Sequence, residues 1–396
     1  MKPMKTRILL ASLAIAGLVF TGCESDDTAP VIIENNQGGG NGDETPEDNN
    51  IGGTMTSNLT LELGTEYNLT EALIMTDGTT LTIPAGVVIK ANPGAGVYIA
   101  IAQGATINAE GTSSSPIVMT SSIATPSAGD WGGLIILGKA PINSVAGGDA
   151  TSTSEIGGLP YGGSSASDNS GTIRYVRVEY SGGAADASSE NNGFSFYGVG
   201  NGTTVEYIQA FEGKDDGIEF FGGTVNASFI SVVGSQDDSV DWTEGFSGNL
   251  TNVYVEHRVE HDKAFECDGF NTDIGNNSNP TFWSNPTVTN VTVVGRGSAT
   301  GNEAIRLRAG TQGIFNNVWI QGYEEGFDLD GNTGESPTGQ GVLDGNLAAN
   351  NVSFEDVALK MKNDTEYVFE ESDFISGDGN GTGADYDSWN TGWTRN

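Results

Sequence analysis

Basic residues are scarce in this chain. Its 396 residues include 16 lysines and arginines and two histidines against 52 aspartates and glutamates, so the formal net charge is −36 at pH 7. Nucleic-acid binding depends on neutralising phosphates with lysine and arginine, so this composition argues against a nucleic-acid partner. It also argues against peripheral binding to anionic lipid, and attachment to a membrane would need some other anchor.

Helical periodicity and the common catalytic signatures are also missing. No stretch holds a sustained apolar period of 3.6 residues, which predicts little helix. The chain has no nucleophile elbow, no glycine loop of the kind that cradles phosphate, and no histidine and cysteine spacing typical of zinc sites. We therefore expect no organic cofactor. With 58 glycines, only 12 prolines and many short runs of β-branched and aromatic residues between polar clusters, the sequence indicates an all-β chain.

What the chain does contain is a short phrase that returns six times: two polar residues, a small residue, then an apolar–polar–apolar triplet. The copies begin at Asn191, Asp215, Asp237, Asp262, Asn302 and Glu324, with spacings of 24, 22, 25, 40 and 22 residues. A period in the twenties with one short strand per copy is typical of a solenoid. The 40-residue step contains an insertion, which we place at residues 271–286.

We predict a right-handed parallel β-helix over residues 55–370, with roughly a dozen coils that each rise about 4.8 Å. The first apolar position of each copy then forms one inward ladder, and the second apolar position, which includes Cys267, forms another. Cys267 is therefore expected to be a buried, inert thiol. Residues 144–170 are expected to leave the coil as a long loop, and residues 371–396, with Trp389 and Trp393, to form a C-terminal cap or tail over the open end.

The head of the chain has the pattern of an export signal. Lys2, Lys5 and Arg7 precede an apolar stretch at residues 8–20, which is too short to cross a bilayer as a helix and indicates a signal peptide at residues 1–22. Val19-Phe20-Thr21-Gly22-Cys23 resembles a lipobox, which implies cleavage before Cys23 and lipidation of its thiol. Such a modification would leave Cys267 without a partner for an intrachain disulfide.

The segment after Cys23 is acidic and rich in glycine. Residues 23–54 cannot bury a core, so we expect a flexible tether there. Glu24-Ser25-Asp26-Asp27 resembles the surface-export signal of Bacteroidota lipoproteins. The resemblance implies an outer-membrane lipoprotein that is exposed on the cell surface.

Several segments of the body together resemble a known group of proteins. They are Gly129-Asp130-Trp131-Gly132-Gly133, the run from Ile173 to Tyr180, the run from Gly200 to Tyr207, and the run from Glu219 to Asn226. They are similar to segments of the widespread right-handed β-helix surface lipoproteins of Bacteroidota. The resemblance covers most of residues 55–330. It implies a fold and a location, and it brings no catalytic residues with it.

The polar positions of the repeated phrase predict a row of carboxylates. Stacking adjacent coils would place Glu219, Asp241 and Glu266 about 5 Å apart, where like charges repel. A Ca²⁺ ion binds oxygen at about 2.3–2.6 Å, so one ion can bridge such a pair. The alternative is that the carboxylates are solvated and spread apart. The candidate metal ligands are Asp215, Asp216, Glu219, Asp237, Asp238, Asp241, Asp262 and Glu266.

The scarce cations gather beside this row. Residues 257–308 contain both histidines and five basic residues, and the candidate catalytic residues among them are His257, His261, Lys263 and Arg306. Charge pairing is the simpler interpretation, with Arg306 between Glu266 and Asp328 in the stacked column. The favoured function is thus a surface lipoprotein whose β-helix is a binding or structural module, stabilised by Ca²⁺, with a glycan or another surface protein as partner. The alternative is a surface polysaccharide lyase or glycoside hydrolase that acts on an acidic glycan.

Overall fold

The computed structural model of the protein describes residues 48–144, 151–185, 190–272 and 280–396. The chain divides into two units, Met1–Asn36 and Gln37–Asn396, and every described residue belongs to the second. The predicted signal peptide, Cys23 and the tether up to residue 47 lie outside the described residues.

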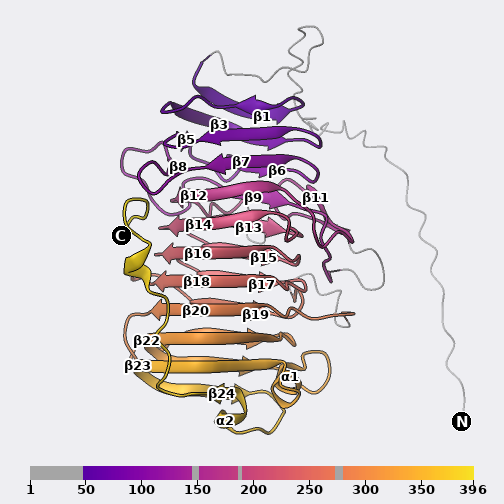
Figure 1. The fold of residues 1–396 in the computed structure, drawn as a ribbon, viewed down its shortest axis with the longest axis vertical. Coiled ribbons are helices and arrows are strands. Elements are labelled where there is room, and N and C mark those ends of the chain that lie inside the picture. The colour runs from indigo at the N-terminus through magenta and orange to yellow at the C-terminus, as the bar shows by residue number, and fades with distance from the viewer. Residues whose placement is uncertain (1–47, 145–150, 186–189, 273–279) are drawn as a thin grey trace, which may run out of the picture. The chain divides into compact units, whose positions relative to one another are not determined.

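The second unit is a parallel β-helix in which strands of successive coils pair in register (Figure 1). We call the series of strands that contains the repeated phrase column A. Column A consists of β1 (Asn50–Met55), β3 (Glu66–Met75), β6 (Ile99–Ile101), β9 (Leu134–Leu137), β13 (Phe194–Tyr197), β15 (Ile218–Phe221), β17 (Val240–Thr243), β19 (Phe265–Asp268), β21 (Glu303–Arg308), β22 (Gly313–Asp330) and β23 (Leu347–Asp364). In the described part of the chain this column is eleven strands deep, which agrees with the prediction of roughly a dozen coils.

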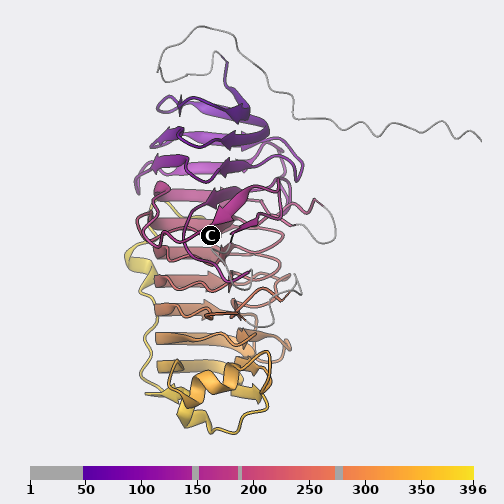
Figure 2. The same cartoon turned by 90° about the vertical axis from the view of Figure 1, so that its right-hand side faces the viewer.

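Two further columns complete each coil. Column B consists of β2 (Leu59–Thr60), β4 (Thr80–Pro84), β7 (Thr106–Glu110), β12 (Gly171–Glu179), β14 (Thr204–Phe211), β16 (Asn226–Val233), β18 (Asn249–Glu256), β20 (Thr287–Val294), β22, β23 and β24 (Ile375–Ser376). Column C begins with the first halves of β1 and β3, followed by β5 (Val88–Ala91) and β8 (Ile117–Ser121). It continues through the second halves of β12, β14, β16, β18 and β20 and the middle parts of β22 and β23. Figure 2 shows the same stack turned by 90°. The predicted fold class, an all-β right-handed parallel β-helix, is confirmed.

The core consists of the ladders that the repeated phrase predicts. Phe194 pairs with Ile218, which pairs with Val240, and the series continues through Phe265 and Ile305. These side chains are fully buried, as is Cys267 in the neighbouring ladder. Each buried apolar side chain of this size stabilises the fold by about 1.5–3 kcal/mol, so the stacked ladders supply most of the stabilising free energy.

A column of left-handed residues bends each long strand between columns B and C. The φ angles are 55° at Tyr207, 57° at Phe229 and 59° at Asn252, and the equivalent residues of the later coils are asparagines as well. Asparagine tolerates this conformation better than most residues. Its amide also bonds along the stack, because Nδ2 of Asn290 donates to Oδ1 of Asn252 at 2.9 Å. The sequence gives no period that isolates this column.

The first predicted loop contains a hairpin. Within residues 144–170, β10 (Thr151–Thr153) pairs antiparallel with β11 (Pro160–Gly162). The hairpin is held to the coils by Tyr161, whose hydroxyl donates to Oε2 of the buried Glu244 at 2.7 Å. Burial raises the pKa of Glu244. The carboxylate also accepts a 3.2 Å hydrogen bond from Asn271, so the Glu244 side chain contacts both the loop at residues 144–170 and the insertion at residues 271–286.

The boundaries of the β-helix differ from the prediction at both ends. β1 begins at Asn50, inside the predicted tether, because Ile51 is buried against the first coil. At the other end, the short helix α1 (Thr338–Leu343) lies between β22 and β23. After β23, the helix α2 (Glu371–Phe374) and β24 close the last coil, and Phe374 is buried. Neither α-helix in the described ranges is long and apolar enough to span a membrane.

Residues 377–396, which we call the C-terminal strap, do not cover the open end as predicted. The strap runs back along the stack toward β14 (Figure 1) and contains the 3₁₀ helix η1 (Tyr386–Ser388). Tyr386 stacks on Tyr254 with ring centroids 3.8 Å apart, and Trp393 lies 5.9 Å from Tyr207. The prediction for Trp389 and Trp393 was wrong because these rings pack on Phe229 and Tyr207, the half-buried aromatic residues at the left-handed turns.

Candidate functional site

The polar residues of the repeated phrase form one stripe along column A. The residue between the two apolar positions pairs in register from coil to coil, in the order Ser195, Glu219, Asp241, Glu266, Arg306 and Asp328. The predicted register is thereby confirmed. Alternation along each strand points these side chains away from the core, since successive residues face opposite sides of a sheet.

The structure brings all eight candidate metal ligands together. We call them the acidic stripe. In each of four overlapping groups of three, carboxylate oxygens lie within 4.8 Å of one another; the groups are Asp215–Asp216–Asp237, Asp216–Glu219–Asp241, Asp237–Asp238–Asp262 and Asp238–Asp241–Glu266. Sequence reasoning missed a further group, Glu303, Glu325 and Asp328, which belongs to later copies of the phrase.

The acidic stripe is poorly solvated. Asp216, Asp238 and Glu266 are only 7%, 4% and 8% exposed, so the expectation that solvated carboxylates spread apart does not hold for them. Burial raises the pKa of Asp216 and Glu219 well above the usual range, and their carboxylate neighbours raise it further. The pKa of Asp215 rises to about 8, through burial and then through Glu190 and Asp237. The ionised forms of these carboxyl groups are therefore disfavoured here unless a proton or a cation compensates their charge.

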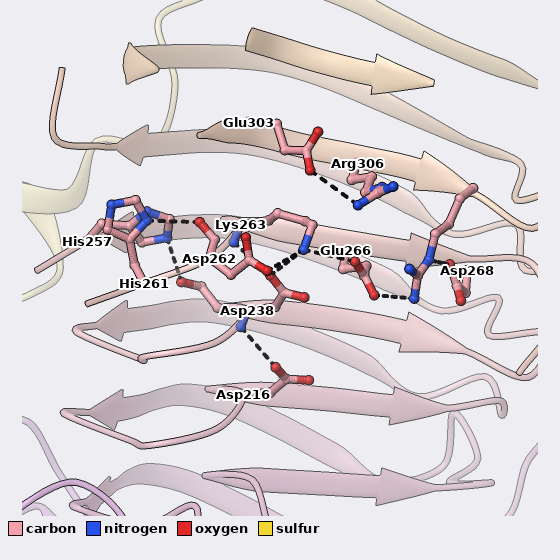
Figure 3. Close-up of polar contacts among 12 residues, drawn as sticks. Asp216, Asp238, His257, His261, Asp262, Lys263, Glu266, Asp268, Glu303 and Arg306 are labelled. Carbon is pink, nitrogen blue, oxygen red and sulfur yellow. Dashed lines mark hydrogen bonds and ion pairs between the residues drawn. The ribbon is translucent and has the colours of Figure 1, made fainter. Parts of the chain in front are cut away.

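Backbone hydrogen bonds hold the second polar residue of two copies of the phrase, Asp216 and Asp238. Oδ1 of Asp216 accepts a 3.0 Å bond from the backbone N–H of Asp238, and Oδ1 of Asp238 accepts a 2.7 Å bond from that of Lys263 (Figure 3). A short acceptor side chain at this position can therefore bind a backbone N–H of the next coil. Asn192 occupies the same position one coil earlier, and its Nδ2 donates to Oε2 of Glu219 at 2.6 Å.

Lys263 neutralises one end of the acidic stripe. Its Nζ lies 2.6 Å from Oδ2 of Asp262, 3.1 Å from Oε1 of Glu266 and 3.7 Å from Oδ1 of Asp238, and its side chain is 7% exposed (Figure 3). Burial alone would lower the pKa of Lys263, but Asp238 and Glu266 outweigh it and the pKa is raised. A lysine in this state keeps its proton, and a general base needs to release one.

Arg306 does not pair with the residues predicted for it. Although Glu266 and Asp328 flank it in register, its guanidinium lies 2.6 Å from Asp330 and 3.4 Å from Glu303. The reason is competition, because Glu266 already contacts Lys263 and Arg308. Arg308 also contacts Asp268 at 2.6 Å. Sequence reasoning noted this arginine among the cations but assigned it no role, although it lies two residues beyond Arg306 and hence on the same side of the strand.

The two histidines form a separate cluster. His257 is 2% exposed, and its ring nitrogens contact Ser239 Oγ at 3.2 Å and Tyr323 Oη at 3.1 Å. Its ring stacks on His261 with centroids 4.2 Å apart. Burial, together with His261, lowers the pKa of His257 to about 3, so the ring is neutral at physiological pH. His257 therefore packs as a neutral core residue beside the acidic stripe.

Part of the acidic stripe lacks a cationic partner. Among the described basic side chains, none forms an ion pair with Asp216, Glu219 or Asp241. Within this group Oδ1 of Asp241 is buried without a hydrogen-bond partner in the described ranges, and so is Oδ1 of Asn192 on the preceding coil, whose residue is 3% exposed. Oxygen atoms that are buried, close together and unpartnered are the ligands that Ca²⁺ prefers.

Comparison with protein families gives one match that covers most of the chain. A family model described as a pectate-lyase-like beta-helix domain matches residues 53–394. No curated protein sequence matches the chain. The match spans the acidic stripe, the hairpin and the C-terminal strap.

The raised pKa values predict how stability depends on pH. A carboxyl group whose pKa is higher in the folded protein holds its proton longer when folded, so the free energy of unfolding falls as pH rises from about 4 through the folded pKa. The lowered pKa of His257 makes the free energy of unfolding rise with pH instead, and this rise is complete above about pH 6.5. Between pH 6.5 and 8, without divalent cations, Asp241→Asn should therefore make the fall of the unfolding free energy less steep than in the original protein, by up to about 1.4 kcal/mol per pH unit for one proton. Urea denaturation measures this slope.

Asp344→Asn is the matched control for this experiment, because Asp344 is exposed and asparagine keeps the oxygen that accepts from Gln340. Its slope should equal that of the original protein. A slope that is the same in all three proteins would show that the acidic stripe carries no excess charge in this pH range.

Proposed function

Because this chain belongs to the pectate-lyase-like beta-helix family, we propose that it serves as a binding or structural module on the cell surface, and that it does not catalyse a reaction. The observation that carries this proposal is the state of the basic side chains. Lys263 is enclosed by three carboxylates, and His257 is neutral with both ring nitrogens engaged. A lyase needs a basic group that is free to take a proton from its substrate, and these two are committed to internal contacts.

We propose that a divalent cation, Ca²⁺ by its preference for oxygen ligands, stabilises the acidic stripe. Asp216, Glu219 and Asp241 would supply carboxylate oxygens, which lie within 4.8 Å of one another, and Oδ1 of Asp241 is buried without a partner in the described ranges. Lys263 and Arg308 form ion pairs with Glu266 at the other end, so the ion would act where the described residues form no such pair. A cation there would convert repulsion between stacked carboxylates into attraction.

Calcium should raise the melting temperature of the protein above its value in chelator. At a concentration about 100 times the dissociation constant, one bound ion adds about 2.7 kcal/mol, which is several degrees for a chain of this size. Asp241→Asn should melt higher than the original protein in chelator, since repulsion is relieved, and should respond less to calcium. Asp344→Asn is again the control. If calcium shifts none of the three melting curves, and the purified protein contains no metal, the proposal fails.

We further propose that Cys23 anchors the chain to the outer membrane and that the acidic segment after it directs export to the cell surface. The net charge of −36 supports a covalent anchor, because the protein itself would be repelled by anionic lipid. The partners we propose are the membrane, through this lipid, and a glycan or another surface protein.

Cys23→Ala should abolish incorporation of labelled palmitate and move the protein from the membrane fraction to the soluble fraction. Cys267→Ala is the control, because Cys267 is a buried core residue and should not affect labelling. Protease treatment of intact cells should degrade the anchored protein if it faces outward. Persistent membrane attachment of Cys23→Ala, or full protection from protease in cells, would contradict the anchor or the surface location respectively.

A second candidate function is a lyase or hydrolase that acts on an acidic glycan. The observation that favours it is the cluster of Lys263 and Arg308 around Glu266, which places two cations and several carboxylates on one face of the β-helix. Cations of this kind can neutralise a uronate, and paired carboxylates can act as acid and base.

Incubation with polygalacturonate or alginate, followed by ultraviolet absorbance for unsaturated chain ends and by a reducing-end assay, separates the two functions. We expect no turnover with or without calcium. Turnover that is abolished by Lys263→Ala and kept by Lys360→Ala, which changes an exposed lysine paired with Asp378, would establish the enzyme and refute the binding-only function.

A further inference from the structure

A groove lies between the C-terminal strap and the outer face of column C. Its floor is formed by Tyr254, Thr292, Val294, Trp319 and Gln321, and its wall by residues 382–387 of the strap. It encloses about 540 Å³, within the range of about 300–1,000 Å³ typical of small-ligand sites. The groove lies on column C, whereas the acidic stripe lies on column A, so the groove is separate from the proposed calcium site.

The wall of the groove is fixed in place. Oγ1 of Thr292 accepts a 2.9 Å hydrogen bond from the backbone N–H of Ala384 and donates to the carbonyl of the same residue. Gly383 has a φ of 68°, and a Cβ at this position would lie 2.2 Å from Oγ1 of Thr292. Because glycine alone permits this approach, the strap sits directly against β20 and the groove is pre-formed.

Trp319 is an open aromatic ring in this groove. It follows Tyr254 and Thr292 in register on the outer face of column C. Tyr254 is stacked on Tyr386, and Trp389 and Trp393 pack on each other and on the rings of the turns. The half-buried Trp319 has no ring partner, and its indole N–H has no hydrogen-bond partner, within the described ranges.

The polar side chains that line the groove carry no positive charge. Gln321 offers an amide, Thr382 a hydroxyl, and Asp385 and Asp387 two exposed carboxylates at the rim. No lysine or arginine lines the groove in the described part of the chain. A ligand with many hydroxyl groups can bond to all of these groups, whereas a uronate would be repelled by the two aspartates.

From this geometry we infer that the groove binds a pyranose ring of a neutral polysaccharide, with the sugar lying on the face of Trp319 and its hydroxyls bonded to Gln321, Asp385 and Asp387. An organic cation would need several rings that converge on it. Here Tyr254 and Tyr386 are stacked on each other, which leaves Trp319 as the single open platform. The inference rests on the proposed binding role and names its ligand class and its site.

Isothermal titration of the full chain in detergent tests the inference. The probes are cellohexaose, mannohexaose and xylohexaose as neutral sugars, trigalacturonate as an acidic sugar and tetramethylammonium as a cation. We expect at least one neutral hexaose to bind with quenching of tryptophan fluorescence. Trp319→Ala should weaken that binding at least about tenfold, and Trp319→Phe, which keeps a ring, should retain most of it.

Trp283→Ala is the matched control, since Trp283 is a half-buried tryptophan that does not line the groove. Its affinity should be unchanged, and the melting temperatures of all variants should show that they are folded. Binding of a neutral hexaose that Trp319→Ala does not weaken would refute the groove as the site while the binding role stands. Absence of binding to all three hexaoses, or binding of trigalacturonate or tetramethylammonium in this groove, would overturn the inference, and turnover of a polyuronate would separately overturn the proposed function.

Discussion

In-register stacking of coils is the constraint on which the rest of this structure depends. Each coil lies about 4.8 Å above the previous one, so every side chain meets its equivalent from the coils above and below. For apolar residues this is favourable, and Phe194, Ile218 and Val240 build a core ladder from it. Asparagines gain in the same way, because Asn290 and Asn252 exchange an amide hydrogen bond. For carboxylates the same geometry is costly, and the acidic stripe shows where the cost falls.

The chain offsets this cost differently along the stripe. Toward β19 and β21, cations from the protein itself enter the row, since Lys263 and Arg308 both contact Glu266. Toward β15 and β17, no described basic side chain forms an ion pair with Asp216 or Asp241, and burial raises the pKa of both groups. Three carboxylates in one place can be accommodated by protons or by a bound cation. Protonation needs no ligand, but the protons are lost as pH rises. A bound cation compensates the charge at neutral pH and above, so pH and the concentration of divalent cation determine which state dominates.

The parts that could be predicted from the sequence are those that repeat. The six copies of the phrase fixed the register of column A and the membership of the acidic stripe, because a stacked coil leaves little freedom to equivalent positions. Contacts between parts that do not repeat were missed or wrong. Tyr161 reaches Glu244 from an excursion, and Trp393 reaches Tyr207 from the far end of the chain, with no spacing to announce either contact. The predicted ion pairs of Arg306 were wrong for a related reason. The register determines the position of its backbone, but competition for Glu266 determines which carboxylates its guanidinium contacts.

Stability and the proposed recognition of a ligand depend on different parts of this molecule. The acidic stripe concerns column A and the balance of charge, which affects stability, whereas the groove on column C combines one open tryptophan with uncharged and acidic hydrogen-bonding groups. A strongly acidic protein cannot use charge to attract a polyuronate, and an acidic groove would reject one. An aromatic platform does not depend on charge, because a sugar ring packs on it through apolar C–H groups. The excess of carboxylates therefore favours the proposed neutral partner over an acidic one.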